Sequence, residues 1–88
     1  MIAVTIYSRS GCHLCDEMKA LVTRVGRDQP LRLTEIDIAA DPALECEYGL
    51  EIPVLVVNGR KAAKYRIAEA DLRRLLQATA GGPSGSGG

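Results

Sequence analysis

Two cysteines separated by two residues, in Cys12-His13-Leu14-Cys15, stand at the junction of two segments with different hydrophobic periods. The segment before them, Ile2 to Tyr7, has apolar or β-branched residues at both odd and even positions. This pattern predicts a central strand buried on both faces. After them, apolar residues recur at helical spacing as far as Val25, and Gly26 is a suitable helix end. The sequence therefore places both sulfurs on the first turn of a helix that follows a buried strand.

The next part of the chain predicts a second strand and a short helix. Leu31 to Ile38 has the composition of a strand, and its apolar parity switches along its length. The switch predicts a bulge or a strand covered on both faces. Asp41-Pro42 combines a capping side chain with a proline at the first helical position, so a short helix is expected from there to Gly49.

The C-terminal part predicts a hairpin and a last helix. Val54 to Val57 and Arg60 to Arg66 flank Asn58-Gly59, a strong signal for a two-residue turn, and the basic second strand suits a sheet edge. A helical apolar stripe follows, formed by Ala68, Leu72, Leu75, Leu76 and Thr79. Strand-helix-strand at the start implies a parallel pair and the hairpin an antiparallel one, so a mixed sheet covered by helices is expected. This domain would occupy residues 1–80, and residues 81–88, which are only glycine, serine and proline, would form a disordered tail.

Length and charge limit the classes of partner. The 88 residues hold one small domain with a thin core. The 11 Lys+Arg balance the 11 Asp+Glu, so there is no electrostatic reason to expect nucleic acid or an anionic membrane as a partner. The longest run free of polar side chains, Ile52 to Val57, is too short to span a bilayer, and the N-terminus has no basic leader. We therefore expect a monomeric cytoplasmic protein.

The paired cysteines suit disulfide exchange, which needs an attacking thiolate and a second thiol that displaces the resulting mixed disulfide. Cys12 lies where the free N–H groups and the dipole of the helix N-terminus favour a thiolate, so it is expected to be the nucleophile. Cys15, one turn deeper, would be the resolving thiol.

Charged neighbours are expected to tune the Cys12 pKa in both directions. Arg9 and a protonated His13 would lower it, whereas Asp16 and Glu17 in the first helical turn would raise it. The sequence thus predicts a Cys12 pKa that is lowered but not extreme.

A metal site is the other reading of a CxxC pair. A structural zinc site needs four ligands, and outside the motif only Cys46 remains, because His13 is the sole histidine. A carboxylate or a second chain would have to complete such a site, so we expect no bound metal. Cys46 itself is expected to be a small buried hydrophobe, with a regulatory or dimer-forming cysteine as the alternative.

Taken together, these motifs resemble the thioredoxin superfold and, more narrowly, the small glutaredoxin-like proteins. The resemblance extends to about Ala80 and rests on Tyr7-Ser8-Arg9-Ser10-Gly11-Cys12-His13-Leu14-Cys15, Asp37, Tyr48-Gly49, Ile52-Pro53-Val54 and Asn58-Gly59. It implies a minimal thioredoxin-like α/β fold, with a four-stranded mixed sheet flanked by helices.

The resemblance also implies a function. Pro53 would be a cis-proline facing the dithiol, and Ile52, Pro53 and Val54 would bind an extended substrate segment; a trans proline that merely opens the strand is the alternative. The implied activity is thiol-disulfide exchange on protein disulfides or glutathione mixed disulfides. No cofactor is implied, and electrons would come from glutathione or a partner reductase.

The chain departs from the glutaredoxin pattern after the hairpin. Glutaredoxins usually carry a glycine pair followed by an acidic residue there, whereas this chain has no glycine between Gly59 and Gly81. Lys61, Lys64 and Arg66 would either hold the carboxylates of glutathione or form a solvated edge. Two other functions stay open, an iron-sulfur or metal carrier using Cys12 from two chains, and a non-catalytic binding module. Tyr7 and Tyr48 are expected to be packing groups.

Overall fold

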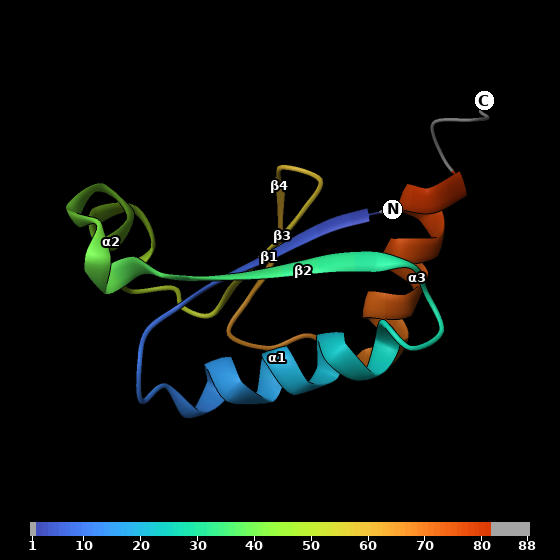
Figure 1. Cartoon of the computed structure of the whole chain (residues 1–88), viewed down its shortest axis with the longest axis horizontal. Coiled ribbons are helices and arrows are strands. Elements are labelled where there is room, and N and C mark those ends of the chain that lie inside the picture. The colour runs from blue at the N-terminus through green and yellow to red at the C-terminus, as the bar shows by residue number, and fades with distance from the viewer. Residues whose placement is uncertain (1, 82–88) are drawn as a thin grey trace.

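Four strands form one mixed sheet in the order β2-β1-β3-β4, seen in a computed structural model that describes residues 2–81 (Figure 1). The elements in chain order are β1 (Ile2–Ser8), α1 (His13–Val25), β2 (Leu31–Asp37), the 3-10 turn η1 (Ile38–Ala40), α2 (Pro42–Tyr48), β3 (Val54–Val57), β4 (Arg60–Lys64) and α3 (Glu69–Gly81). The expected four-stranded mixed sheet with flanking helices is confirmed.

β1 occupies the middle of the sheet and fixes where the CxxC motif lies. It pairs in parallel with β2 and antiparallel with β3, and Tyr7 near its end is opposite Val54 at the start of β3. The loop that leaves β1 toward Cys12 and the segment that enters β3 from Pro53 therefore meet at the same end of the sheet.

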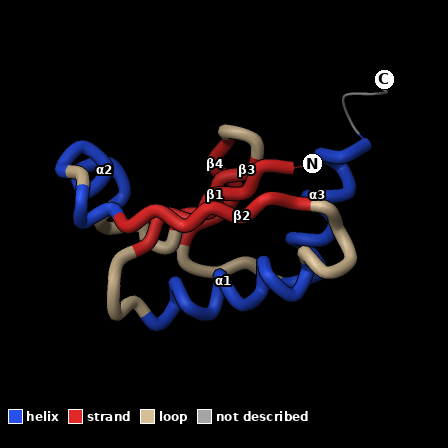
Figure 2. Tube along the Cα trace, in the orientation of Figure 1, coloured by secondary structure: helices blue, strands red, loops and turns tan. Residues whose placement is uncertain are grey.

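Helices α1 and α3 cover the same face of the sheet, while α2 lies beyond its end (Figure 2). The residues of this core that are fully or nearly fully buried are Ile2, Val4, Ile6, Met18, Val22, Val25, Leu55, Val57, Leu72 and Leu76. The prediction that β1 is buried on both faces was wrong, because Ala3 is exposed and Thr5 and Tyr7 are only half-buried. With both long helices on one side, only half of each strand faces the core.

β2 has no bulge, contrary to the first of the two alternatives predicted for it. Its register with β1 is continuous from Leu31 to Asp37. Leu31 and Leu33 pack against the core, whereas Ile36 faces the opposite side, as does its register partner Tyr7. The apolar residues of β2 change from one face to the other because Glu35, the residue after Leu33 on the core-facing side, is polar and exposed. The irregularity of the sheet lies instead in β3–β4, between Leu55 and Val56.

The predicted helix and turn signals are borne out. Asp41 caps α2, its Oδ1 atom accepting a 2.9 Å hydrogen bond from the backbone N–H of Ala43. Asn58 and Gly59 both have positive φ, 49° and 84°, as a two-residue hairpin of the primed type requires.

Several boundaries differ from the predicted ones, beginning with β1, which ends at Ser8 and not at Tyr7. β2 ends at Asp37, whose side chain caps the turn η1, and not at Ile38. β4 ends at Lys64 and not at Arg66, because Tyr65 turns the backbone with φ 67°. α3 includes Gly81, so the helix enters the stretch predicted as a disordered tail, and the rest of that tail lies outside the described residues. Within residues 2–81, no helix combines the length and the apolar character needed to cross a bilayer.

A polar contact ties α1 to β2 at the end of the sheet near the CxxC motif. The Lys19 ammonium lies 3.0 Å from one Glu35 carboxylate oxygen, and the Ser8 hydroxyl donates a 3.1 Å hydrogen bond to the other. The hydrogen bond from Lys19, more than the one from Ser8, holds the pKa of Glu35 below its ordinary value.

Two leucines give a matched test of the core. Leu72 of α3 is 0% exposed and Leu50 is 92% exposed. Leu72→Ala is expected to lower the free energy of unfolding by about 2–5 kcal/mol, because it removes buried methyl groups and leaves a cavity, whereas Leu50→Ala should change it by about 0.5 kcal/mol or less. Urea titration followed by circular dichroism measures both. Equal effects of the two substitutions would contradict the described core.

The Glu35 contact predicts a pH effect with a defined sign. A carboxyl whose pKa is lower in the folded than in the unfolded state stabilises the fold above its unfolded pKa, and this contribution is lost as pH falls through the folded pKa. Lys19→Gln should raise the Glu35 pKa toward the ordinary value of a glutamate, and Lys19→Arg should keep it low. NMR titration of the Glu35 carboxyl checks this, and an unchanged pKa in Lys19→Gln would rule out Lys19 as the main cause.

Candidate functional site

A tight loop turns the chain from β1 into α1 at the CxxC motif. Gly11 adopts a left-handed φ of 81°, which favours glycine, and the backbone N–H of Cys12 donates a 3.1 Å hydrogen bond to the Arg9 carbonyl. Cys12 is then the N-cap of α1, and its Sγ atom accepts a 3.2 Å hydrogen bond from the backbone N–H of Cys15. The sulfur of Cys12 therefore occupies the position of a helix-capping acceptor.

The two sulfurs of the motif differ in exposure. A disulfide joins Cys12 to Cys15, with Cα atoms 5.2 Å apart. Cys12 is half-exposed, whereas Cys15 is 2% exposed. A substrate in solution can therefore reach Cys12 but not Cys15. This asymmetry agrees with the predicted roles of nucleophile and resolving thiol.

Both side chains predicted to tune Cys12 lie against carboxylates. A guanidinium nitrogen of Arg9 lies 2.6 Å from one Glu45 oxygen and contacts the other as well, which links the CxxC loop to α2. The His13 Nε2 atom lies 2.9 Å from Glu17, and the His13 side chain is 86% exposed. Arg9 and His13 thus each contact a carboxylate, which leaves the free N–H groups of the helix N-terminus, opposed in part by Asp16 in the first turn, as the positive field at Cys12.

The Ile52-Pro53 peptide bond is cis, as the resemblance implied. The three residues predicted to bind substrate differ in access: Ile52 is half-exposed, whereas Pro53 and Val54 are fully buried. Val54 lies in the ladder between Tyr7 and Lys64. Of the three side chains, Ile52 is therefore the one that a bound segment can reach.

Tyr65 is a functional candidate that the sequence did not reveal. Its φ of 67° is a genuine outlier for a bulky side chain. Its backbone N–H donates to the Pro53 carbonyl at 2.9 Å, and its hydroxyl donates to the Leu50 carbonyl at 2.9 Å. Tyr65 therefore fixes both ends of the segment that precedes β3. No glycine or asparagine marks this left-handed position, and no signal in the sequence would have found it.

The two tyrosines predicted to be packing groups do pack. The rings of Tyr7 and Tyr48 stack with centroids 4.5 Å apart and planes inclined by 20°. Burial raises the pKa of Tyr48 above its usual value, and the Lys61 ammonium lies 6.0 Å from the centre of its ring.

The basic residues after the hairpin split into two groups. Glu51 lies 2.7 Å from Lys61 and 3.9 Å from Lys64, and its hydrogen bond with Lys61 lowers the pKa of Glu51 and raises that of Lys61. Arg66 makes none of the ion pairs found among residues 2–81. Unlike Lys61 and Lys64, Arg66 therefore has no carboxylate partner among the described residues.

The prediction that Cys46 is a buried hydrophobe was wrong, because its thiol is free and exposed. The reason is the position of α2, which lies beyond the end of the sheet and has no buried residue. As for metal ligation, the described residues contain no group of three or more His, Cys, Asp or Glu side chains placed to hold an ion.

Comparisons with known proteins agree with this geometry. The family model described as Glutaredoxin-like domain (DUF836) matches residues 3–77. The uncharacterized protein Rv0508 of Mycobacterium tuberculosis is 28% identical, over 91% of this chain and 89% of its own length.

Solved structures give the same result. A structural genomics target from X. campestris is 34% identical, with a TM-score of 0.71 over 85% of this chain and 96% of its own. Protein Ne2328 from Nitrosomonas europaea is 26% identical, with a TM-score of 0.75 over 85% of this chain and 91% of its own. A thioredoxin from Halobacterium salinarum, 20% identical with a TM-score of 0.66 over 88% of this chain and 73% of its own, shares the fold. The chain belongs to the glutaredoxin-like domain family, within the thioredoxin superfold.

Proposed function

We propose that the protein is a thiol-disulfide oxidoreductase that works through Cys12 and Cys15. The observation that carries the proposal is the asymmetric pair at the start of α1, in which a half-exposed Cys12 caps the helix beside a buried Cys15. A thiolate at Cys12 would accept a hydrogen bond from the backbone N–H of Cys15 and would lie in the positive field of the helix N-terminus. Both effects would lower the Cys12 pKa below that of a free thiol.

The exchange proceeds in two steps. The Cys12 thiolate attacks one sulfur of a substrate disulfide, forming a mixed disulfide while the other substrate sulfur leaves as a thiolate and takes up a proton. Cys15 then loses its proton and attacks the Cys12 sulfur, which forms the Cys12–Cys15 disulfide and releases the second substrate sulfur as a thiolate. The dithiol is oxidised by two electrons and the substrate disulfide is reduced by two.

The substrate would be a disulfide-bearing protein or a glutathione mixed disulfide. Glutathione or a partner reductase would return two electrons to the Cys12–Cys15 disulfide, so no bound cofactor is required. A reducing cytoplasm and a monomeric state fit this cycle, because both leave Cys12 open to successive partners.

Trapping tests the two roles separately. Cys15→Ser cannot resolve the mixed disulfide, so this variant should accumulate a covalent adduct through Cys12 when it is mixed with a disulfide-bonded substrate such as intact insulin. Cys12→Ser should form no adduct at that position, and Cys46→Ser should behave as the parent chain does. Mass spectrometry of the intact protein reads out each adduct. The absence of any Cys12 adduct in Cys15→Ser would argue against exchange.

The Arg9–Glu45 ion pair predicts a tuning effect on Cys12. Glu45→Gln keeps the size of the side chain but removes the charge that opposes Arg9, so the Cys12 pKa should fall. Glu47→Gln, a matched change on the same helix, should leave it unchanged. Thiolate absorbance of the reduced protein, titrated against pH, measures both. An equal pKa in Glu45→Gln and the parent would exclude Arg9 as a tuning residue.

A further inference from the structure

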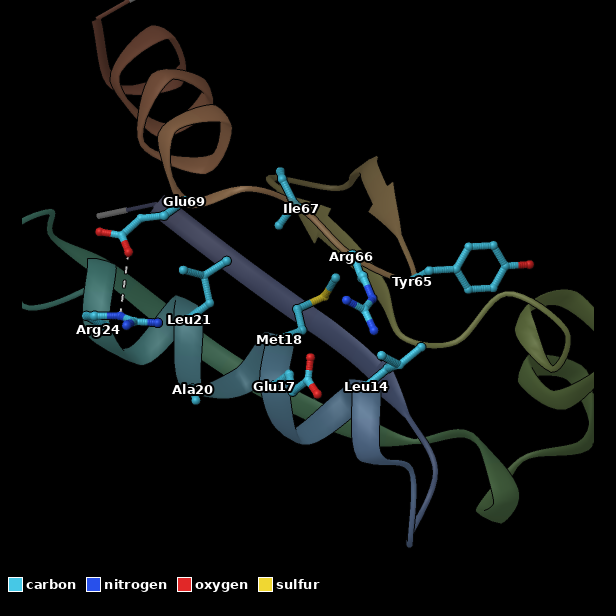
Figure 3. Close-up of a pocket in the computed structure, with 10 residues that line it drawn as sticks. All are labelled: Leu14, Glu17, Met18, Ala20, Leu21, Arg24, Tyr65, Arg66, Ile67 and Glu69. Carbon is cyan, nitrogen blue, oxygen red and sulfur yellow. Dashed lines mark ion pairs between the residues drawn. The ribbon is translucent and has the colours of Figure 1, made fainter.

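A groove of about 490 Å³ lies between α1 and the loop from β4 to α3 (Figure 3). Its apolar lining comes from Leu14, Met18 and Leu21 of α1 and from Ile67 of the loop. This volume is within the range of sites that hold small ligands or a few side chains.

The groove begins within one helical turn of the dithiol, because its lining residue Leu14 is one of the two residues between Cys12 and Cys15. From Leu14 to Leu21 the axis of α1 advances by about 10 Å, which equals about three residues of an extended peptide. A segment whose cysteine reacts at Cys12 can thus place a nearby side chain in the groove.

The charges around the groove favour one kind of occupant. Arg24 lies 3.7 Å from Glu69, and Glu17 lies 2.9 Å from the Nε2 atom of His13, so each of these rim side chains has a partner within the protein. Arg66 makes no ion pair among residues 2–81, and its guanidinium points toward α1 (Figure 3). An apolar lining beside a cation that makes no ion pair is complementary to a bulky aliphatic side chain followed by an acidic one.

We propose that this groove selects protein disulfides in which an aliphatic residue, with an acidic neighbour, lies within about three residues of the reactive cysteine. The inference rests on the proposed function and narrows its substrate class to proteins, because glutathione has no aliphatic side chain to occupy the groove. Leu21 and Ile67 are its specificity-determining residues on the apolar side, and Arg66 is the one on the charged side.

Synthetic peptides test the proposal through the rate of exchange. Each peptide carries one cysteine as a mixed disulfide with thionitrobenzoate, which leaves as a coloured thiolate when Cys12 attacks the peptide sulfur. A peptide with Leu-Asp three residues from the cysteine should react about 10-fold faster than its Ser-Asp analogue, because one aliphatic side chain is largely buried. Hydroxyethyl disulfide, too small to reach the groove, reports the exchange chemistry by itself.

Two groove variants and one control locate the effect. Ile67→Ser should remove most of the preference for leucine. Because Ile67 also packs against the core, Arg66→Glu provides a second variant on an exposed residue. It should slow the Leu-Asp peptide and speed a Leu-Lys analogue, each by about 2- to 5-fold. Arg27→Glu, the same charge change outside the groove, should do neither.

The outcomes separate the two proposals. A leucine preference that is lost in Ile67→Ser, together with the charge reversal in Arg66→Glu, supports the groove. Equal rates for the leucine and serine peptides, with normal reduction of hydroxyethyl disulfide, overturn the groove and leave the oxidoreductase. No reaction with any of these disulfides overturns both.

Discussion

The position of the candidate site depends on strand β1, which forms backbone hydrogen bonds with both of its neighbours in the sheet. It pairs in parallel with β2 and antiparallel with β3. Because β1 is central, its last residues are fixed by backbone hydrogen bonds on both sides, and α1 starts only a short loop later. The same pairing places the start of β3, and the cis Ile52-Pro53 bond before it, at that end of the sheet. A rigid frame thus holds the dithiol and the proline segment together without an enclosed pocket.

Most of the basic side chains near the dithiol lie against carboxylates. Arg9 faces Glu45, His13 faces Glu17, and Lys61 faces Glu51. Exposed ion pairs contribute little to stability. Within each pair, however, the two opposite charges offset each other's electric field at a distance. The helix N-terminus at Cys12 and the guanidinium of Arg66, which makes no ion pair among residues 2–81, are positive features that an incoming partner would meet here.

Local signals in the sequence predicted most of the fold, and they predicted the Cys12–Cys15 pair of the candidate site. The CxxC motif, the Asp41 cap and the Asn58-Gly59 turn each depend on a few neighbouring residues, and each lies where it was expected. The sequence could not predict that α2 lies beyond the end of the sheet, because that depends on tertiary packing, and so it placed Cys46 in the interior. Tyr65 was missed for a different reason: tertiary hydrogen bonds hold it in a conformation that its own residue type disfavours.

Exposed Cys46 provides an internal standard for the central claim that Cys12 is an accessible, activated thiolate and Cys15 a protected one. The decisive measurement is the rate at which each of the three thiols of the fully reduced protein is alkylated by limiting iodoacetamide at slightly acidic pH, read by mass spectrometry of peptides. We expect Cys12 to react first, Cys46 more slowly and Cys15 last. Alkylation of Cys46 as fast as Cys12, or of Cys15 before Cys12, would contradict it.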